Sequence, residues 1–275
     1  MKRTLCTILA VLLMACLLGA CGATEKKDAA EGDWKYISDN GKMVVGYTDY
    51  APMNYYDENG TFTGFDTEFA IAICKKLGVE PDFVEINWDT KVIELDAKSI
   101  DCIWNGMTIN ETLSQNTSIS LPYVKNAQVV IIKKDNAALY TDTASLIGKT
   151  VVAEVGSAGE AQVSGEDADA NLAQATYFAV AKQTDCLVEV KAGTADAAVL
   201  DWTLAMTMIG EGTDYADLTM ITGLELNTEE YGIAFRKGSN VTEKVNAAIK
   251  ELVTDGTLPA LAAKYGLSLA PAIAK

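Results

Sequence analysis

The chain has 275 residues, with 22 Lys and Arg against 38 Asp and Glu, so its formal net charge is -16 at pH 7. An acidic surface of this kind repels the phosphates of nucleic acids, which excludes nucleic acid as an expected partner. The chain contains no histidine, which excludes His-dependent hydrolytic dyads and His-ligated metals, and we expect neither a metal nor another cofactor.

The N-terminus has the layout of a secretory signal peptide, in which Lys2 and Arg3 precede a short apolar run. The Leu-Gly-Ala-Cys stretch that ends at Cys21 resembles the lipobox of bacterial lipoproteins, in which the chain is cut before the cysteine and the cysteine is acylated. We expect a signal peptide over residues 1–20, a lipid such as palmitate on Cys21, and a charged tether over residues 21–33. An ordinary signal peptide with a chance cysteine, or an uncleaved anchor helix, is the alternative. The expected location is the outer face of the cytoplasmic membrane of a Gram-positive-like cell.

Strands and helices alternate in the first part of the globular region, which begins near Trp34. Apolar residues spaced by four, from Phe65 to Leu77, predict a helix that stops at Gly78. The other elements expected here are a strand over 43–47, a turn over 58–60, a strand over 82–86, a helix around 91–98 and a buried strand over 100–104.

The alternation starts again near residue 126. The expected strands cover 126–134, 150–155, 175–180, 196–200 and 231–238. The expected helices are a short one over 143–148, one that follows Gly156, and further ones over 184–193, 201–210, 241–256 and 258–266. Strands that alternate with helices are typical of parallel sheets covered by helices, so the predicted fold class is α/β.

Two successive α/β units followed by a late return predict two lobes. We expect the chain to cross between them near 126–130 and near 225–231, which gives lobe 1 residues 34–126 and 229–275 and lobe 2 residues 127–228. Ligands of α/β folds bind at the carboxyl ends of strands and between domains. The sequence therefore predicts a ligand site between the lobes.

Three cysteines of the globular region, Cys74, Cys102 and Cys186, are far apart and lie in apolar runs. An odd, sparse set of this kind is not a disulfide framework. We expect buried small hydrophobic side chains, with a single disulfide pair as the alternative.

Seven sequence blocks, taken together in their order and spacing, carry a family resemblance over nearly all of the globular region. They are VVGYTDYAPM, GFDTEFA, IDCIWNGMTI, LPYVKNAQVVI, GKTVVAEVGSAGE, TADAAVLDW and EEYGIAFRKG. The chain resembles the polar-amino-acid type of extracellular solute-binding proteins that serve ABC importers, especially those tethered as lipoproteins. The resemblance implies a monomer with a type II periplasmic-binding-protein fold, in which two mixed sheets flanked by helices are joined by a two-strand hinge and close around one small ligand. An ABC permease is the implied partner.

The same resemblance places ligand contacts in the first half of the chain. Tyr50 and Trp88 match aromatic residues that cover the ligand, with core packing as the alternative for both rings. Gly106 and Thr108 match backbone and hydroxyl contacts at a strand end, where glycine permits close approach, and Asn105 belongs to the same wall. A plain tight turn is the alternative for Gly106.

Further contacts follow from the second half. Ser157 and Ala158 match backbone donors to a carboxylate at a helix start, although Ser157 would equally be a simple N-cap. Glu154 occupies a specificity position or is a solvated acid at a strand end. Asp201 matches the carboxylate that pairs with the ligand ammonium, and the alternative is an N-cap for the helix that follows.

Leu113 departs from the pattern, because many relatives have an arginine there that holds the ligand α-carboxylate. No Lys or Arg occurs between Lys98 and Lys125. Either amides and hydroxyls such as those of Thr108 and Ser157 hold the carboxylate, or the ligand has none. With Asp49, Glu154 and Asp201 as candidate pocket acids and no matched cation, the set suits a basic amino acid or a cationic amine; Asp49 would alternatively point to water.

The expected function is capture of an amino acid or a related small amine by hinge closure and its delivery to a permease. An enzyme resembling cyclohexadienyl dehydratase is the main alternative, with Glu154 as its acid, and we expect no enzymatic activity. A sensor or adhesion module on the cell surface is a third possibility.

Overall fold

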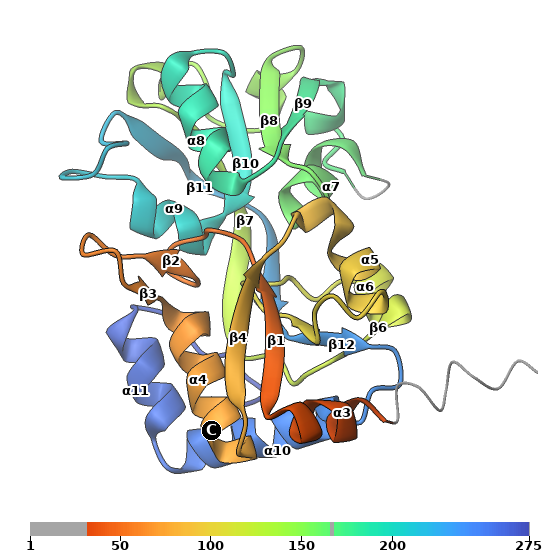
Figure 1. Cartoon of the computed structure of the whole chain (residues 1–275). Coiled ribbons are helices and arrows are strands. Elements are labelled where there is room, and N and C mark those ends of the chain that lie inside the picture. Colours follow the sequence, from red (N-terminus) through yellow and green to blue (C-terminus); the bar gives the residue numbers. More distant parts are fainter. Residues whose placement is uncertain (1–31, 166–167, 275) are drawn as a thin grey trace, which may run out of the picture.

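A computed structural model describes residues 32–165 and 168–274 of the chain. The expected signal peptide, the proposed lipidation site Cys21 and residues 21–31 of the expected tether lie outside the described residues. Two five-stranded sheets, each flanked by helices, lie one above the other in Figure 1. No helix in the described part of the chain has both the length and the apolar character that crossing a membrane requires.

The first sheet has the strand order β4-β1-β5-β12-β6 and is mixed. Its strands are β1 (Lys42–Tyr47), β4 (Glu80–Glu85), β5 (Cys102–Ile103), β6 (Thr117–Ile119) and β12 (Ala234–Arg236). β1 pairs in parallel with β4 and β5, whereas β12 runs antiparallel to β5 and β6. Its helices are α3 (Asp33–Asn40), α4 (Phe65–Leu77), α5 (Lys91–Asp96), α6 (Glu111–Asn116), α10 (Val241–Thr254) and α11 (Thr257–Lys264). A small hairpin, β2 (Tyr55–Tyr56) and β3 (Phe62–Thr63), precedes α4.

The second sheet has the order β11-β7-β10-β8-β9 and is also mixed. Its strands are β7 (Val124–Lys133), β8 (Thr150–Glu154), β9 (Thr176–Val180), β10 (Ala197–Asp201) and β11 (Leu218–Tyr231). Helices α7 (Ala158–Ser164), α8 (Gln183–Ala192) and α9 (Trp202–Met208) accompany it. The prediction of an α/β fold with two mixed sheets flanked by helices is confirmed.

Two long strands, β7 and β11, connect the two halves of the molecule (Figure 1). They pair antiparallel from Val124 opposite Tyr231 to Lys133 opposite Leu218. Tyr231 also forms an isolated bridge with Thr108, and β12 of the first sheet begins three residues later at Ala234. The chain therefore enters and leaves the second sheet on neighbouring strands, which is the arrangement expected of a hinge. The exact lobe boundaries stay a prediction.

Buried ion pairs fix the start of the described fold. Arg236 of β12 donates from Nε to Asp33 at 2.8 Å and from Nη2 to Asp101 at 3.0 Å. All three side chains are at most 6% exposed. Helix α3 therefore begins at Asp33, one residue before the predicted start of the globular region, because the Asp33 carboxylate belongs to the interior of the first lobe.

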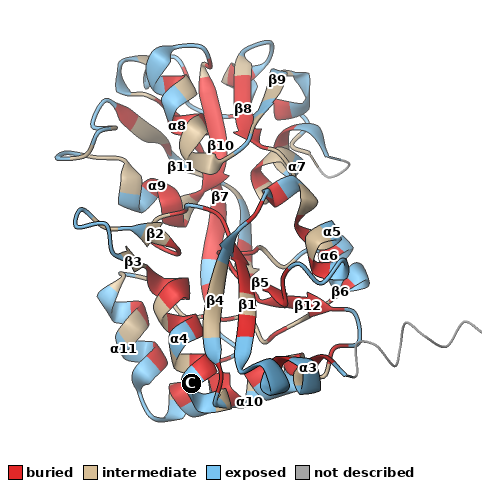
Figure 2. Cartoon of the chain, in the orientation of Figure 1, coloured by how far each residue is buried: buried red, intermediate tan, exposed pale blue. Residues whose placement is uncertain are grey.

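The core follows the apolar patterns of the sequence. In Figure 2 the central strands are buried, and the outward faces of the flanking helices are exposed. Phe65, Phe69 and Ile73 of α4 are fully buried, and Gly78 ends this helix with φ +75°, as its apolar spacing predicted. The cysteines Cys74, Cys102 and Cys186 are buried free thiols, which confirms their expected role and excludes the alternative of a disulfide among them.

Three element predictions need correction. The short helix expected over 143–148 is a single 3-10 turn, Ala144–Leu146. The last strand expected over 231–238 is only β12, whereas the much longer β11 was not predicted. Helices α3 and α6 and strand β6 were not predicted either, because short or polar segments carry little periodicity and depend on tertiary partners.

Candidate functional site

A pocket lies between the two sheets and is lined by residues from both. It encloses about 460 Å³ of empty space, part of it open to solvent. Every residue predicted to contact a ligand lines it: Asp49, Tyr50, Trp88, Asn105, Gly106, Thr108, Leu113, Glu154, Ser157, Ala158 and Asp201. The structure therefore brings the whole predicted set together, while their contacts with a ligand stay a prediction.

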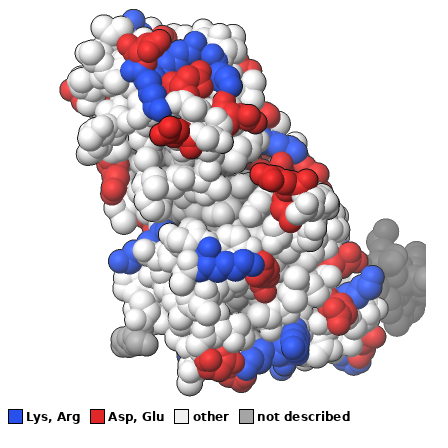
Figure 3. Space-filling model, turned by 90° about the vertical axis from the view of Figure 1, so that its left-hand side faces the viewer, with Lys and Arg blue, Asp and Glu red and all other residues white. Residues whose placement is uncertain are grey.

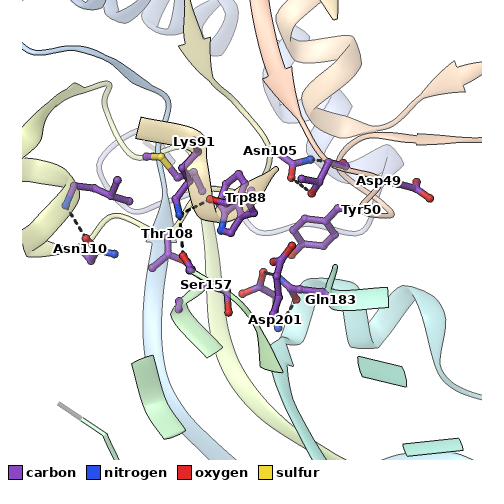
Figure 4. A pocket seen from close by; sticks show the side chains of 17 residues that line it. Asp49, Tyr50, Trp88, Lys91, Asn105, Thr108, Asn110, Ser157, Gln183 and Asp201 are labelled. Carbon is purple, nitrogen blue, oxygen red and sulfur yellow. Dashed lines mark hydrogen bonds between the residues drawn. The ribbon is translucent and has the colours of Figure 1, made fainter. Parts of the chain in front are cut away.

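Two aromatic side chains face this pocket from the first lobe (Figure 4). The Tyr50 hydroxyl is hydrogen-bonded to the Tyr231 hydroxyl at 2.6 Å, and Tyr50 is 3% exposed. Trp88 is 7% exposed and packs in an apolar cluster with Leu113 and Met107. Core packing and pocket lining are thus not alternatives for these rings, because each ring does both.

Gly106 forms a tight turn against the rings of Tyr50 and Tyr231, where a side chain has no room. Its φ is +55°, and a Cβ atom would lie 2.7 Å from Cε1 of Tyr50 and 3.2 Å from Cε2 of Tyr231. Its N–H donates to Oδ2 of Asp66 at 2.6 Å, and Asp66 also accepts from the Tyr123 hydroxyl at 2.9 Å. Burial raises the pKa of Asp66 to about 7. A buried carboxyl group therefore holds this wall of the pocket from behind.

Asn105 is also fixed by hydrogen bonds with a neighbouring loop. Its Nδ2 donates to the Thr48 carbonyl at 2.8 Å, and its Oδ1 accepts from the Thr48 hydroxyl at 2.6 Å. These bonds fix the loop after β1 against the loop after β5, which is the edge where parallel strands end. Asn105 thus positions the pocket wall through Thr48.

Asp201 ends β10 and carries the densest set of polar contacts in the pocket. Its Oδ1 accepts from Asn126 and Gln128, and its Oδ2 accepts from Gln183. Asp201 stands at the N-cap position of α9, as one of the two interpretations stated, but its side chain forms no cap hydrogen bond with that helix. Burial raises the pKa of Asp201.

A second carboxylate, Glu229 of β11, lies behind Asp201 and was not predicted. The amides of Asn126 and Gln128 each donate to Oδ1 of Asp201 and to Oε1 of Glu229. The Thr108 hydroxyl also donates to Glu229, at 2.7 Å, so the proton of Thr108 is already committed to a protein acceptor. Burial, followed by the charge of Asp201, raises the pKa of Glu229 to about 7. Burial and the mutual repulsion of Asp201 and Glu229 therefore favour a state in which the pair keeps a proton.

Glu154 lies at the end of β8 and is only 3% exposed. The alternative of a solvated acid is therefore wrong. Burial, followed by the charge of Asp201, raises the pKa of Glu154 to about 8. Its Oε1 has no hydrogen-bond partner among the described residues, and an unsatisfied buried polar atom of this kind is costly unless a ligand meets it.

The turn after β8 leads into α7. The Ser157 hydroxyl accepts from the Glu160 N–H at 3.1 Å, so Ser157 is the N-cap of α7, as its alternative stated. Ala158 is the first residue of that helix and lines the pocket beside it. The Ser157 N–H donates to the Glu154 carbonyl at 3.2 Å, so this predicted backbone donor is already engaged within the turn.

Leu113 and Asp49 have different surroundings. Leu113, on α6, is 6% exposed and belongs to the apolar cluster beside Trp88, so an apolar wall stands at the position where an arginine was expected. Asp49 is exposed, and in Figure 4 it points away from the other labelled side chains. The alternative of a water-facing acid therefore describes Asp49, although it stands at the rim.

The expectation that no cationic side chain accompanies the pocket acids is wrong. Lys91, the first residue of α5, lines the pocket and is 7% exposed. Its Nζ donates to the carbonyls of Trp88 at 2.9 Å and Gly156 at 2.8 Å, and lies 4.7 Å from the centre of the Trp88 ring. Burial lowers its pKa to about 8.

Other lining residues were also missed, and two sequence signals pointed to residues of this site. Lys91 follows Trp88 by three positions, a spacing that places two side chains on one helical face. The second signal concerns residues that hold the pocket rather than line it: Asn126 and Gln128 alternate on one face of β7, whose other residues are apolar except Lys125 and Lys133. The pocket residues not predicted are Thr48, Lys91, Met107, Asn110, Gly156 and Gln183.

The surface does not share the character of the pocket. The face in Figure 3 carries Lys and Arg interspersed with Asp and Glu, so the net negative charge does not form one continuous field there.

The sequence matches one protein family over most of its length. The family described as bacterial extracellular solute-binding proteins, family 3, matches residues 43–268. The L-cystine-binding protein TcyJ of Escherichia coli (strain K12) is 29% identical over 270 residues, which cover 96% of this chain and 95% of that protein.

Solved structures agree with this match. The arginine-bound form of a truncated ArgBP from T. maritima has a TM-score of 0.71 and 34% identity, and the match covers 79% of this chain and 99% of that one. The ancestral amino acid-binding protein AncCDT-1, a precursor of cyclohexadienyl dehydratase, has a TM-score of 0.75 and 30% identity, with coverage of 84% and 98%.

Proposed function

The chain belongs to the bacterial extracellular solute-binding proteins of family 3, and from that premise we propose that it captures an amino acid for an ABC importer. The ligand enters between the two sheets, the halves close on it about β7 and β11, and the closed form is presented to a membrane permease. The relatives are amino-acid-binding proteins: TcyJ is an L-cystine-binding protein, and ArgBP has an arginine-bound form. The protein acts as a monomer, held by a lipid on Cys21 at the outer face of the cytoplasmic membrane.

One observation supports a cationic ligand group above all. Asp201 and Glu154 are both 3% exposed, line the same pocket and form no ion pair with a basic side chain among the described residues. Buried carboxyl groups without an ion-pair partner either keep a proton or bind a cation. The charge of Lys91 offsets the burial of Glu154 only in part, because the pKa of Glu154 stays raised to about 8. An amino group of the ligand between Asp201, Glu154 and the rings of Tyr50 and Trp88 supplies that cation.

The proposed function is ligand binding without an enzymatic reaction. AncCDT-1 is described as a precursor of a dehydratase, and the raised pKa of Glu154 would suit a general acid. We assign Glu154 to ligand binding instead, because the similarity to the L-cystine-binding protein TcyJ extends over 96% of this chain and 95% of that protein.

A thermal-shift panel on residues 22–274 tests the ligand class, after unfolding and refolding to remove carried-over ligand. At one hundred times its dissociation constant a ligand adds about 2.7 kcal/mol, which raises the melting temperature of a domain of this size by roughly 5 to 10 °C. We expect such a rise with a basic or sulfur-containing amino acid, and its loss in Asp201→Asn. No rise with any amino acid would contradict the proposal.

The anchor has its own test. Membrane and soluble fractions of cells that express the full chain are compared for the wild type and for Cys21→Ser. We expect the wild type in the membrane fraction and the variant outside it, and equal membrane retention of both would rule out lipidation at this cysteine.

A further inference from the structure

Lys91 is a buried ammonium group whose neighbours do not satisfy it. Its Nζ has three hydrogens and donates to two carbonyl oxygens, those of Trp88 and Gly156. No carboxylate in residues 32–165 and 168–274 forms an ion pair with it. A buried charge that has only neutral acceptors is costly, and a bound anion would offset that cost.

The surroundings oppose the charged state of this lysine, although nearby acids favour it. Burial is the largest cause and lowers the pKa of Lys91, while the charges of Glu154, Asp89 and Glu160 raise it. Lys91 still carries its proton over most of the range below pH 8. The ammonium is therefore present at neutral pH and stands at the pocket wall with one hydrogen that neither carbonyl takes.

Lys91 and the pocket acids come from opposite sides of the site. Lys91 begins α5, which packs on strands β5 and β12 of the first sheet. Glu154 and Asp201 end strands β8 and β10 of the second sheet. In Figure 4 Lys91 lies beside Trp88 and above Thr108, with Asp201 on the far side of the pocket. Lys91 and Asp201 therefore lie on different sides of the pocket (Figure 4), whereas Glu154 is the acid whose charge most favours the Lys91 ammonium.

We propose that Lys91 is the carboxylate-binding residue of this pocket and that the ligand is a zwitterionic amino acid rather than an amine without a carboxylate. The free N–H of Lys91 donates to the ligand carboxylate, and the ligand ammonium faces Asp201. Lys91 also donates to the carbonyl of Gly156, which follows β8, so the same ammonium contacts segments of both halves of the pocket. This inference rests on the proposed function.

A purely structural role for Lys91 makes a different prediction. If the lysine only fixes the Gly156 turn, its removal weakens every ligand of the pocket by the same factor. If it binds a carboxylate, its removal weakens amino acids and spares amines that lack the carboxylate. The ratio of the two affinities separates these roles, and a change in stability alone does not affect it.

The experiment measures dissociation constants by calorimetry for three pairs of probes: L-arginine and agmatine, L-lysine and cadaverine, L-cystine and cystamine. The first two pairs differ by one carboxylate, and the third pair differs by two. The variants are Lys91→Met, which keeps an unbranched apolar stem, and Lys91→Arg, which keeps the charge. Lys149→Met is the matched control, because Lys149 also lies over an aromatic ring, 5.9 Å from the centre of Tyr140, but is exposed and does not line the pocket.

We expect the wild type to bind at least one amino acid ten or more times as tightly as its decarboxylated partner. Lys91→Met should lose that preference, with the amine affinity changed less than about threefold, while Lys91→Arg and Lys149→Met keep the preference. A preference that persists in Lys91→Met, or its absence in the wild type, would overturn the assignment of Lys91 and leave the proposed function standing. Binding of no amino acid by the wild type would contradict the proposed function itself.

Discussion

The Gly106→Ala substitution tests whether the pocket turn is as tightly defined as its geometry indicates. The backbone of Gly106 has φ +55°, and its added Cβ would lie 2.7 Å from Tyr50, 3.2 Å from Tyr231 and 3.3 Å from Cγ of Met53. All three neighbours are at most 3% exposed, so they have little room to move away. The substitution combines an unfavourable backbone conformation with overpacking of a buried cluster.

The two costs can be separated. A left-handed backbone costs an L-residue about 1–2 kcal/mol, and an extra methyl group in a packed interior costs about 1–3 kcal/mol. The sum is about 2–5 kcal/mol, which lowers the melting temperature of a domain of this size by roughly 4 to 20 °C. Gly60→Ala is the matched control, because Gly60 has φ +76° and no atom within 4 Å of its added Cβ. It should lose only the contribution of the backbone conformation, which is roughly 2 to 8 °C.

Thermal unfolding followed by circular dichroism measures both variants, and calorimetry measures the affinity for the amino acid found in the panel. Gly106→Ala should also bind that ligand at least tenfold more weakly, because the methyl group displaces the Tyr50 ring that lines the pocket. Equal melting temperatures for the two variants would refute the argument from close contact. An unchanged affinity in Gly106→Ala would show that Tyr50 does not cover the ligand.

Two further predictions concern buried charges. Arg236→Ala leaves the carboxylates of Asp33 and Asp101 buried without their partner, so it should lower the free energy of unfolding, measured in urea, by about 3–5 kcal/mol. The control Lys42→Ala breaks an exposed ion pair and should lower it by less than about 1 kcal/mol. Similar losses in the two variants would contradict the account of the Arg236 pairs. Burial raises the pKa of Glu229 to about 7 from its ordinary value of 4.5, so its contribution to stability is complete below pH 4.5 and is lost as the pH rises through 7. The free energy of unfolding without ligand should therefore fall by up to about 3 kcal/mol over this range, and Glu229→Gln should fall less; identical pH profiles would show that Glu229 does not keep its proton.

Local sequence patterns predicted most elements of the fold. The apolar spacing of α4 and its terminal Gly78, and the apolar runs of β7, β8 and β10, were sufficient because each segment shows its period within a few residues. The sequence did not reveal β11, whose residues alternate irregularly and whose pairing with β7 shifts register between Met220 and Asn227. It also did not reveal α3, which is fixed by the contact of Asp33 with Arg236, 203 residues later.

The positions of the predicted site residues followed from the ordered motifs, because the ends of successive strands meet at one edge of each sheet. Their states did not follow. From the sequence, the Asp201 side chain could have capped α9. In the structure it lines the pocket and accepts hydrogen bonds from Gln128 and from Asn126, which is 75 residues away in the chain.

The sequence by itself determined the fold class, the alternation of strands and helices and most of the residues that border the pocket. Only the tertiary structure decided which of these residues are charged, which are already hydrogen-bonded and where the pocket cation lies. Lys91 is a surface-type residue in the sequence, yet it is 7% exposed in the fold and has a pKa lowered to about 8. The physical reason is that desolvation depends on the atoms that surround a group, and for Lys91 and Glu154 those atoms come from segments distant in the chain.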